Sequence, residues 1–154
     1  MSKQAVFRTA GSGRLQNVLG MLQRVRVEPS DGGEAFLMIE LSVAPGHGAP
    51  MHTHEIDSEC FYLLEGSLTF IDDAGTQRIA RAGDVCFLPP RRPHAFRNDG
   101  ETPARALVIA SPGREAVEFF DEIDTTIGSG VPDFAAVSSI AERHKLRILP
   151  PPSA

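Results

Sequence analysis

The chain has 154 residues, of which 42% are hydrophobic and 23% charged, and its formal net charge is −5 at pH 7. This length fits one domain with a buried core, and the acidic balance argues against the basic face needed for non-specific nucleic-acid binding. Residues 1–13 contain no apolar stretch of the kind found in secretory signals. No run of apolar residues is long enough to cross a membrane, so we expect a cytoplasmic protein.

Short apolar runs separated by turn residues begin at residue 35. Glu65-Gly66 predicts a hairpin between two of these runs, and Asp72-Asp73-Ala74-Gly75 predicts a second tight turn. Strands are predicted over residues 35–45, 59–64, 67–71, 77–80, 85–88, 94–97 and 105–110. Strands recurring about every eight to twelve residues favour a sandwich or a barrel.

The apolar periodicity becomes helical after residue 110. Ser111-Pro112 is expected to cap and open a first helix, and Asp133 is expected to cap a second. Their apolar faces are Val117, Phe119, Phe120 and Ile123, and Phe134, Val137, Ile140 and Ala141. Because two such helices would not be stable alone, we expect them to pack on the outside of the barrel.

These elements predict an all-β protein with two short C-terminal α-helices. Its parts are an N-terminal segment with an edge strand over residues 1–34, a barrel over 35–110, a helical extension over 111–149 and a tail over 150–154. The two cysteines, Cys60 and Cys86, are too few for a disulfide framework and are expected as small buried side chains.

A metal site is indicated by histidines and a glutamate near strand ends. His52 and His54 are two residues apart, so in a strand their side chains point to the same face. Glu59 follows five residues later and adds an anionic oxygen ligand. Two histidines and one carboxylate are typical of non-haem metal sites, and His94 is a candidate fourth ligand.

The residues around these ligands resemble the two motifs of the cupin superfamily. The first motif runs from Gly46 through His52, His54 and Glu59 to Gly66, with every spacing matched. In the second motif, Gly83, Pro89, His94 and Asn98 occupy the family positions, whereas Arg91 stands where a glycine is usual. A left-handed backbone is costly for arginine, so we expect a differently shaped loop before His94.

The resemblance implies a double-stranded β-helix, or jelly-roll, barrel of the RmlC-like type. It also implies one divalent transition metal (Fe, Mn, Ni, Zn, Co or Cu) bound by His52, His54, Glu59 and His94, and a homodimer. A single barrel followed by two helices looks most like bacterial quercetin 2,3-dioxygenase-like cupins.

We therefore expect a metal-dependent dioxygenase acting on a small aromatic or enolic compound, with Glu59 as a catalytic base or a metal ligand. The alternatives are a metal-dependent isomerase, decarboxylase or lyase, and a non-enzymatic cupin that binds a small ligand. We expect no nucleic-acid partner and no membrane partner.

The predicted substrate pocket follows from strand parity. Phe61 and Leu63 share parity with Glu59, and Phe96 shares parity with His94, so all three are expected on the metal side. Tyr62 is expected to face away. His47 is either a loop residue near the barrel mouth or a substrate contact.

Four charged residues near the ligands leave their roles open. Glu55 and Asp57 are expected as solvated loop charges. Arg91 and Arg92 form either a solvated turn or an anion clamp at the cavity rim.

Overall fold

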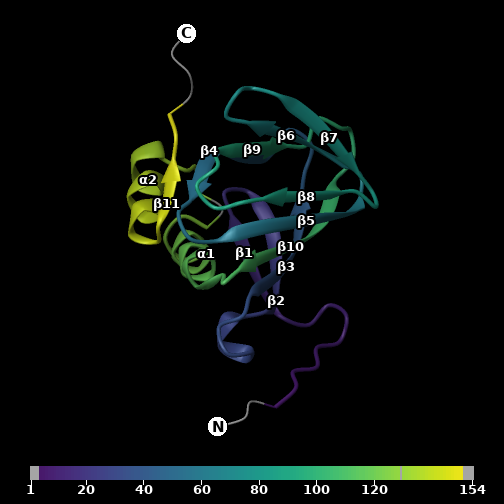
Figure 1. Cartoon of the computed structure of the whole chain (residues 1–154), viewed down its shortest axis with the longest axis vertical. Coiled ribbons are helices and arrows are strands. Elements are labelled where there is room, and N and C mark those ends of the chain that lie inside the picture. The colour runs from purple at the N-terminus through teal and green to yellow at the C-terminus, as the bar shows by residue number, and fades with distance from the viewer. Residues whose placement is uncertain (1–3, 129, 151–154) are drawn as a thin grey trace.

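Two antiparallel β-sheets face each other, with two helices at one end, in the computed structural model, which describes residues 4–128 and 130–150 (Figure 1). The strands are β1 (Arg14–Val18), β2 (Met21–Val27), β3 (Leu37–Val43), β4 (Gly48–His54), β5 (Ser58–Glu65), β6 (Ser67–Asp72), β7 (Gln77–Arg81), β8 (Val85–Leu88), β9 (His94–Arg97), β10 (Ala104–Ser111) and β11 (Leu146–Ile148). The helices are the short 3-10 helix η1 (Pro29–Asp31), α1 (Arg114–Thr126) and α2 (Phe134–Arg143). In the described part of the chain, neither α-helix is long and apolar enough to cross a membrane.

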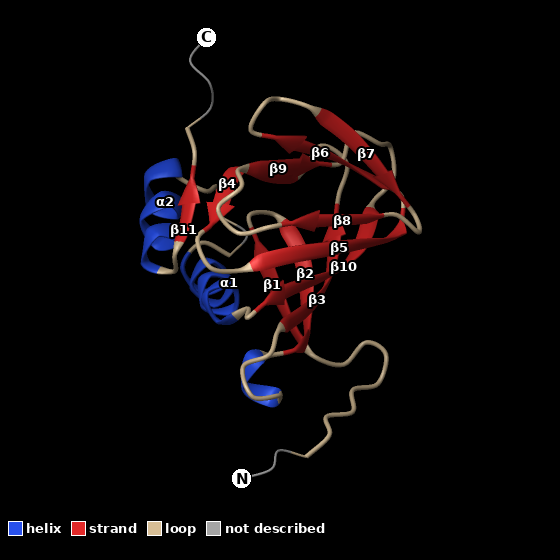
Figure 2. Cartoon of the chain, viewed as in Figure 1, coloured by secondary structure: helices blue, strands red, loops and turns tan. Residues whose placement is uncertain are grey.

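The sheet topology is that of a double-stranded β-helix, which confirms the predicted fold class. The six-stranded sheet has the order β1-β2-β3-β10-β5-β8, and the five-stranded sheet has the order β11-β4-β9-β6-β7. From β3 to β6 the chain alternates between the two sheets, so strands that follow each other in sequence face each other across the core (Figure 2).

This alternation makes the predicted hairpin at Glu65-Gly66 wrong. The chain crosses there from β5 in one sheet to β6 in the other. Gly66 has a φ of 68°, and a Cβ at this position would lie 3.0 Å from Ala104 Cα. Glycine is therefore required by a close crossing rather than by a hairpin. The second predicted turn does join the antiparallel strands β6 and β7, and Asp72 accepts hydrogen bonds from the backbone N–H groups of Ala74 and Thr76.

Alternating burial along the strands fills two connected cores. The larger core lies between the sheets and contains Phe61, Phe70 and Phe96, whose rings pack edge-on or tilted with centroids 5.2 to 5.9 Å apart. The smaller core contains Phe119, Ile123, Val137 and Ile140 from the helices, with residues of β1 and β11. The helices thus pack on the barrel through an apolar face, as amphipathic helices do.

Helix α1 begins differently from the prediction. Ser111 Oγ donates to the backbone oxygen of Ala35 and does not cap the helix. Gly113, with a φ of 83°, precedes the first helical residue. The backbone N–H groups of Gly113 and Ala116 donate to the two carboxylate oxygens of Asp57 at 2.8 and 3.1 Å. Asp57 is only 2% exposed, so it is a buried helix cap and not the solvated charge that the sequence predicted.

The C-terminal part of the chain adds a strand that the sequence analysis missed. Asp133 caps α2 as predicted, accepting from Ala136 N at 3.0 Å. The chain then returns as β11, which pairs with β4 so that Leu146 lies opposite His54 and Ile148 opposite His52. A three-residue strand has too little periodicity to be recognised from sequence. The tail predicted over 150–154 lies, apart from Pro150, outside the described residues.

The two cysteines are free thiols on neighbouring strands, Cys60 on β5 and Cys86 on β8. Each is partly exposed, so the prediction that both are buried is wrong. Strand β8 lies at the edge of the six-stranded sheet, where a side chain has fewer neighbours to cover it.

Candidate metal centre

Four predicted ligands come together between the two sheets. His52 and His54 lie on β4 and His94 on β9, and the pairing of these strands places His52 opposite His94. Glu59 reaches them from β5 in the facing sheet. All four side chains are buried, none being more than 8% exposed.

The donor atoms of these four residues converge. One ligand atom from each lies within 4.8 Å of the other three. Glu59 Oε2 is 3.1 Å from His94 Nε2 and 3.3 Å from His54 Nε2. Three imidazole nitrogens and a carboxylate oxygen at these separations form a donor set that suits a divalent transition metal.

Hydrogen bonds behind the cluster orient two of the imidazoles. His52 Nδ1 donates to the backbone oxygen of Pro50 at 2.7 Å, and His94 Nδ1 donates to the backbone oxygen of Arg92 at 3.0 Å. A carbonyl can only accept, so Nδ1 of each ring carries a proton, and Nε2 is the nitrogen that would supply a lone pair to a bound metal ion. Among the described residues, the buried His54 Nδ1 has no hydrogen-bond partner. The cluster therefore fits a metal ion better than a closed hydrogen-bond network.

The electrostatics favour the metal-binding forms of His52 and Glu59 but not of His54. Burial opposes protonation of His54, but the Glu59 carboxylate outweighs burial and raises the pKa of His54. Burial, together with the imidazoles of His94 and His54, lowers the pKa of His52 to about 3. Burial opposes ionisation of Glu59, but His54 and His94 outweigh it and hold the pKa of Glu59 well below its ordinary value. At neutral pH this places a neutral imidazole beside a carboxylate, which are the ligand forms that metal binding requires.

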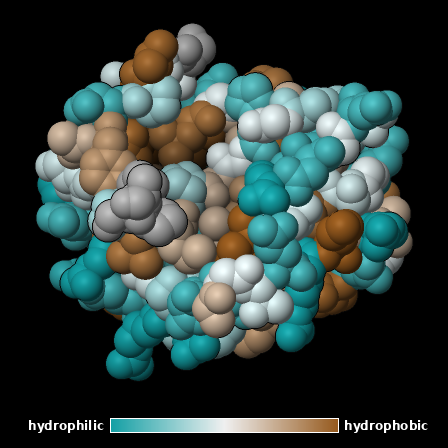
Figure 3. Space-filling view, turned by 90° about the horizontal axis from the view of Figure 1, so that it is seen from above, coloured by the Kyte–Doolittle hydropathy of each residue, from teal (hydrophilic) through white to brown (hydrophobic). Residues whose placement is uncertain are grey.

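An apolar pocket opens onto the cluster. Its lining comes from β1 and β2, the middle of both sheets, helix α1 and strand β11. The lining residues are Val18, Leu19, Met21, Gln23, Ile39, Leu41, Ala49, Pro50, His52, His54, Glu59, Phe61, Phe96, Val108, Phe119, Phe120, Leu146 and Ile148. Figure 3 shows apolar side chains gathered around a hollow on the side of the molecule where α2 and β11 lie in Figure 1.

The predicted pocket residues divide into two groups. Phe61 and Phe96 line the pocket beside the cluster. Leu63 is fully buried in the core between the sheets and is not among the lining residues. His47 is exposed before β4, with Nδ1 3.2 Å from the backbone oxygen of Pro45, and also lies outside the lining. Tyr62 is 45% exposed and faces away, as its parity predicted.

Sequence reasoning missed the part of the pocket contributed from outside the two motifs. The turn between β1 and β2, the aromatic pair Phe119 and Phe120, and the side chains of β11 all reach it. Strand parity could not find them because they come from segments distant in sequence. The aromatic stripe of α1 was the one available signal, and it indicated only that this helix packs on the barrel.

The loop before His94 keeps its turn despite Arg91. This residue adopts a φ of 64°, and its backbone N–H donates to the oxygen of His54 at 2.7 Å. Arginine therefore takes the left-handed conformation of the usual glycine, and the expected change in loop shape is wrong. Arg91 and Arg92 are both exposed, and Arg92 pairs with Asp73 at 3.3 Å. Neither lines the apolar pocket.

A double-stranded β-helix that brings three histidines and a glutamate together between its sheets is a barrel with a candidate metal site. Residues 39–110 match the family model described as the cupin domain. This match spans 72 of the 154 residues and supports a similarity of the barrel to the cupin superfamily.

Among curated relatives, Germin-like protein 1 of Brassica napus is 37% identical over 98 residues, which cover 59% of this chain and 47% of that protein. The chain thus spans about half the length of this relative. A structure titled as a predicted oxalate decarboxylase from Thermotoga maritima is similar with a TM-score of 0.60 and 25% identity, covering 69% of this chain and 97% of that chain. The polyketide cyclase RemF from Streptomyces resistomycificus is similar with a TM-score of 0.58 and 27% identity, covering 71% and 79%.

Proposed function

We propose that this protein is a metal-dependent dioxygenase that acts on a small aromatic or enolic compound. The observation that carries the proposal is the apolar pocket that meets the His52, His54 and Glu59 side chains. No lysine or arginine occurs among the described residues that line it. A dianion such as oxalate would have the metal ion as its one cationic partner there and apolar side chains around the rest of it, whereas a flat apolar molecule gains by entering.

The ligand residues are expected to have distinct roles. His52, His54, Glu59 and His94 would hold a divalent ion, which would supply Lewis-acid chemistry toward a substrate oxygen. Glu59 lies at the pocket wall, where it would bind the metal, accept a proton from a substrate hydroxyl, or alternate between the two roles. His52 and His94 are held in place by their backbone hydrogen bonds. Phe61 and Phe96 exclude water from the reacting atoms.

Oxygen consumption tests the dioxygenase. The protein is stripped of metal, loaded separately with Fe, Mn, Ni or Co, and mixed with flavonols and related enediols at an oxygen electrode. We expect at least one metal form to consume oxygen in proportion to substrate, and the His52→Ala variant to consume none. Absence of oxygen consumption with every metal and every compound would refute this function.

A second candidate is an oxygen-independent reaction of the same substrate class, such as a ring closure, isomerisation or decarboxylation. Its support is the similarity to a protein titled as a polyketide cyclase. Product formation from the same compounds under anaerobic conditions, followed by mass spectrometry, separates it from the dioxygenase. Ligand-induced stabilisation with no turnover in either atmosphere would instead favour a binding protein.

A further inference from the structure

The apolar pocket contains one polar side chain that is not a metal ligand. Gln23 lies on β2 and lines the pocket together with its neighbour Met21. It is only 2% exposed. Burying a primary amide among apolar side chains is unfavourable unless its polar atoms are hydrogen-bonded, so this residue needs an explanation that packing alone does not give.

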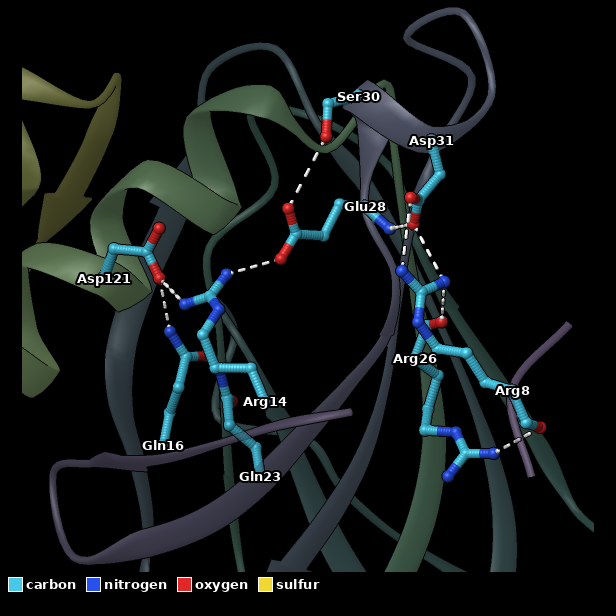
Figure 4. Close-up of polar contacts among 9 residues, drawn as sticks. All are labelled: Arg8, Arg14, Gln16, Gln23, Arg26, Glu28, Ser30, Asp31 and Asp121. Atoms are coloured by element: carbon cyan, nitrogen blue, oxygen red, sulfur yellow. Dashed lines mark hydrogen bonds and ion pairs between the residues drawn. The ribbon is translucent and has the colours of Figure 1, made fainter. Parts of the chain in front are cut away.

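A chain of hydrogen bonds runs from Gln23 to the protein surface (Figure 4). Gln16, which lies opposite Gln23 in the pairing of β1 and β2, accepts from Gln23 Nε2 through its Oε1 at 2.9 Å. The Nε2 of Gln16 donates to the carboxylate of Asp121 on α1. Arg14 also binds that carboxylate, and it continues to Glu28 at 2.7 Å.

The carboxylate at the outer end sets the direction of both amides. A carboxylate accepts hydrogen bonds and cannot donate them, so Gln16 must turn its Nε2 toward Asp121 and its Oε1 toward Gln23. Gln23 must then turn its Nε2 toward Gln16. Among the residues described by the structure, none donates to Gln23 Oε1. Because Gln23 lines the pocket, its side-chain oxygen is left as an acceptor of fixed direction that a ligand in the pocket can reach.

We propose that Gln23 determines specificity by accepting a hydrogen bond from a hydroxyl group of the substrate. The substrate class then narrows to aromatic or enolic compounds that carry a hydroxyl on the side facing β2. Asp121 is a positioning residue that acts through Gln16. The inference rests on the proposed function only in taking this pocket as the substrate site, and it does not depend on which reaction follows.

Binding of two fluorinated probes to metal-stripped protein tests the role of Gln23. The probes 4-fluorophenol and 4-fluorotoluene have similar size, and ¹⁹F NMR titration gives their affinities. We expect wild type to prefer the phenol and the Gln23→Met variant to lose about three- to tenfold of that preference, as one hydrogen bond would give. Binding of 4-fluorotoluene should be unchanged or tighter.

The direction of the hydrogen bonds that link Asp121, Gln16 and Gln23 is tested separately by a substitution at Asp121. The side chain of Asp121 is 45% exposed and does not line the pocket. In Asp121→Asn the new amide can donate to Gln16, so the two glutamines can reverse and Gln23 can present its N–H group. The ether oxygen of 4-fluoroanisole can accept a hydrogen bond, but this compound has no hydroxyl to donate one. We expect the preference of Asp121→Asn for 4-fluorophenol over 4-fluoroanisole to be severalfold lower than that of wild type. The matched control is Asp124→Asn, because Asp124 accepts from Asn17 N outside the chain of amides, and it should keep the wild-type preference.

Three results would overturn the proposal. These are equal affinity of wild type for the phenol and the toluene, no binding of either probe at millimolar concentration, and a phenol preference that survives in both Gln23→Met and Asp121→Asn. If Gln23→Met does not fold, the Asp121→Asn comparison decides alone. Because the titrations use metal-free protein and measure no turnover, they can succeed where the oxygen-consumption test fails.

Discussion

At the scale of single residues, the four side chains of the cluster are the candidate metal ligands, and two backbone carbonyls orient the rings of His52 and His94. His52 and His94 each have Nδ1 fixed by a backbone carbonyl, and His94 Nε2 lies 3.1 Å from Glu59 Oε2. Glu59 contributes the only negative charge among the four ligands. Removing Glu59 should therefore weaken the binding of a divalent cation more than removing one neutral imidazole ligand would.

Metal content after purification without chelator tests this assignment. We expect wild type to contain about one equivalent of a divalent transition metal. We expect His52→Ala and Glu59→Gln to bind the metal at least about tenfold more weakly, because losing only a hydrogen-bond partner of a metal ligand already lowers metal affinity about tenfold or more. Elemental analysis gives the metal-to-protein ratio. The control is His47→Ala, which removes an exposed histidine outside the cluster and should leave the ratio unchanged. Equal metal in all four proteins would refute the site.

At the scale of elements, Asp57 couples the ligand-bearing part of the barrel to the helical extension. It lies in the turn between β4 and β5, two residues before Glu59, and accepts two hydrogen bonds from the first turn of α1. A carboxylate at a helix N-terminus is stabilised by the helix dipole as well as by the hydrogen bonds.

We expect Asp57→Ala to lower the free energy of unfolding by about 2 kcal/mol, because it removes two charge-assisted hydrogen bonds from a buried cap. Chemical denaturation followed by circular dichroism measures the change. The neighbouring Glu55 is exposed, so Glu55→Ala should change stability by no more than about 0.5 kcal/mol. Similar effects of the two substitutions would show that the cap contributes little.

Much of the barrel could be predicted because its signals are local. The strands from β5 to β10 begin and end within a residue or two of the predicted ranges, since glycine, proline and aspartate mark their turns. The four ligands were found from motif spacing for the same reason. The crossing at Gly66, the cap at Asp57 and the pairing of β11 were missed because each depends on a partner distant in sequence.

At the scale of the whole molecule, the ligands tie together both sheets. Three of them lie in one sheet and Glu59 lies in the other. Metal binding should therefore stabilise the folded barrel, because the unfolded chain does not hold the four donor atoms together. The predicted homodimer and the predicted cytoplasmic location remain predictions.

Removal of the metal should lower the melting temperature. A metal present at about one hundred times its dissociation constant adds about 2.7 kcal/mol, which corresponds to roughly 5–10 °C for a protein of this size. Thermal melts of metal-loaded protein with and without chelator measure the shift. His52→Ala should melt at the same temperature in both conditions. If chelator leaves the melting temperature of wild type unchanged, the claim that a metal ion links the two sheets is refuted.

The pairing of β11 with β4 bears on the order in which the molecule is completed during synthesis. Strand β4, which presents His52 and His54, has β9 on one side and β11 on the other. Until residue 148 has left the ribosome, that second edge of β4 has no partner, and the pocket lacks Leu146 and Ile148. Domains fold while synthesis proceeds, so a nascent barrel should hold its histidines on an open edge strand, and the candidate metal site should close only when β11 pairs with β4.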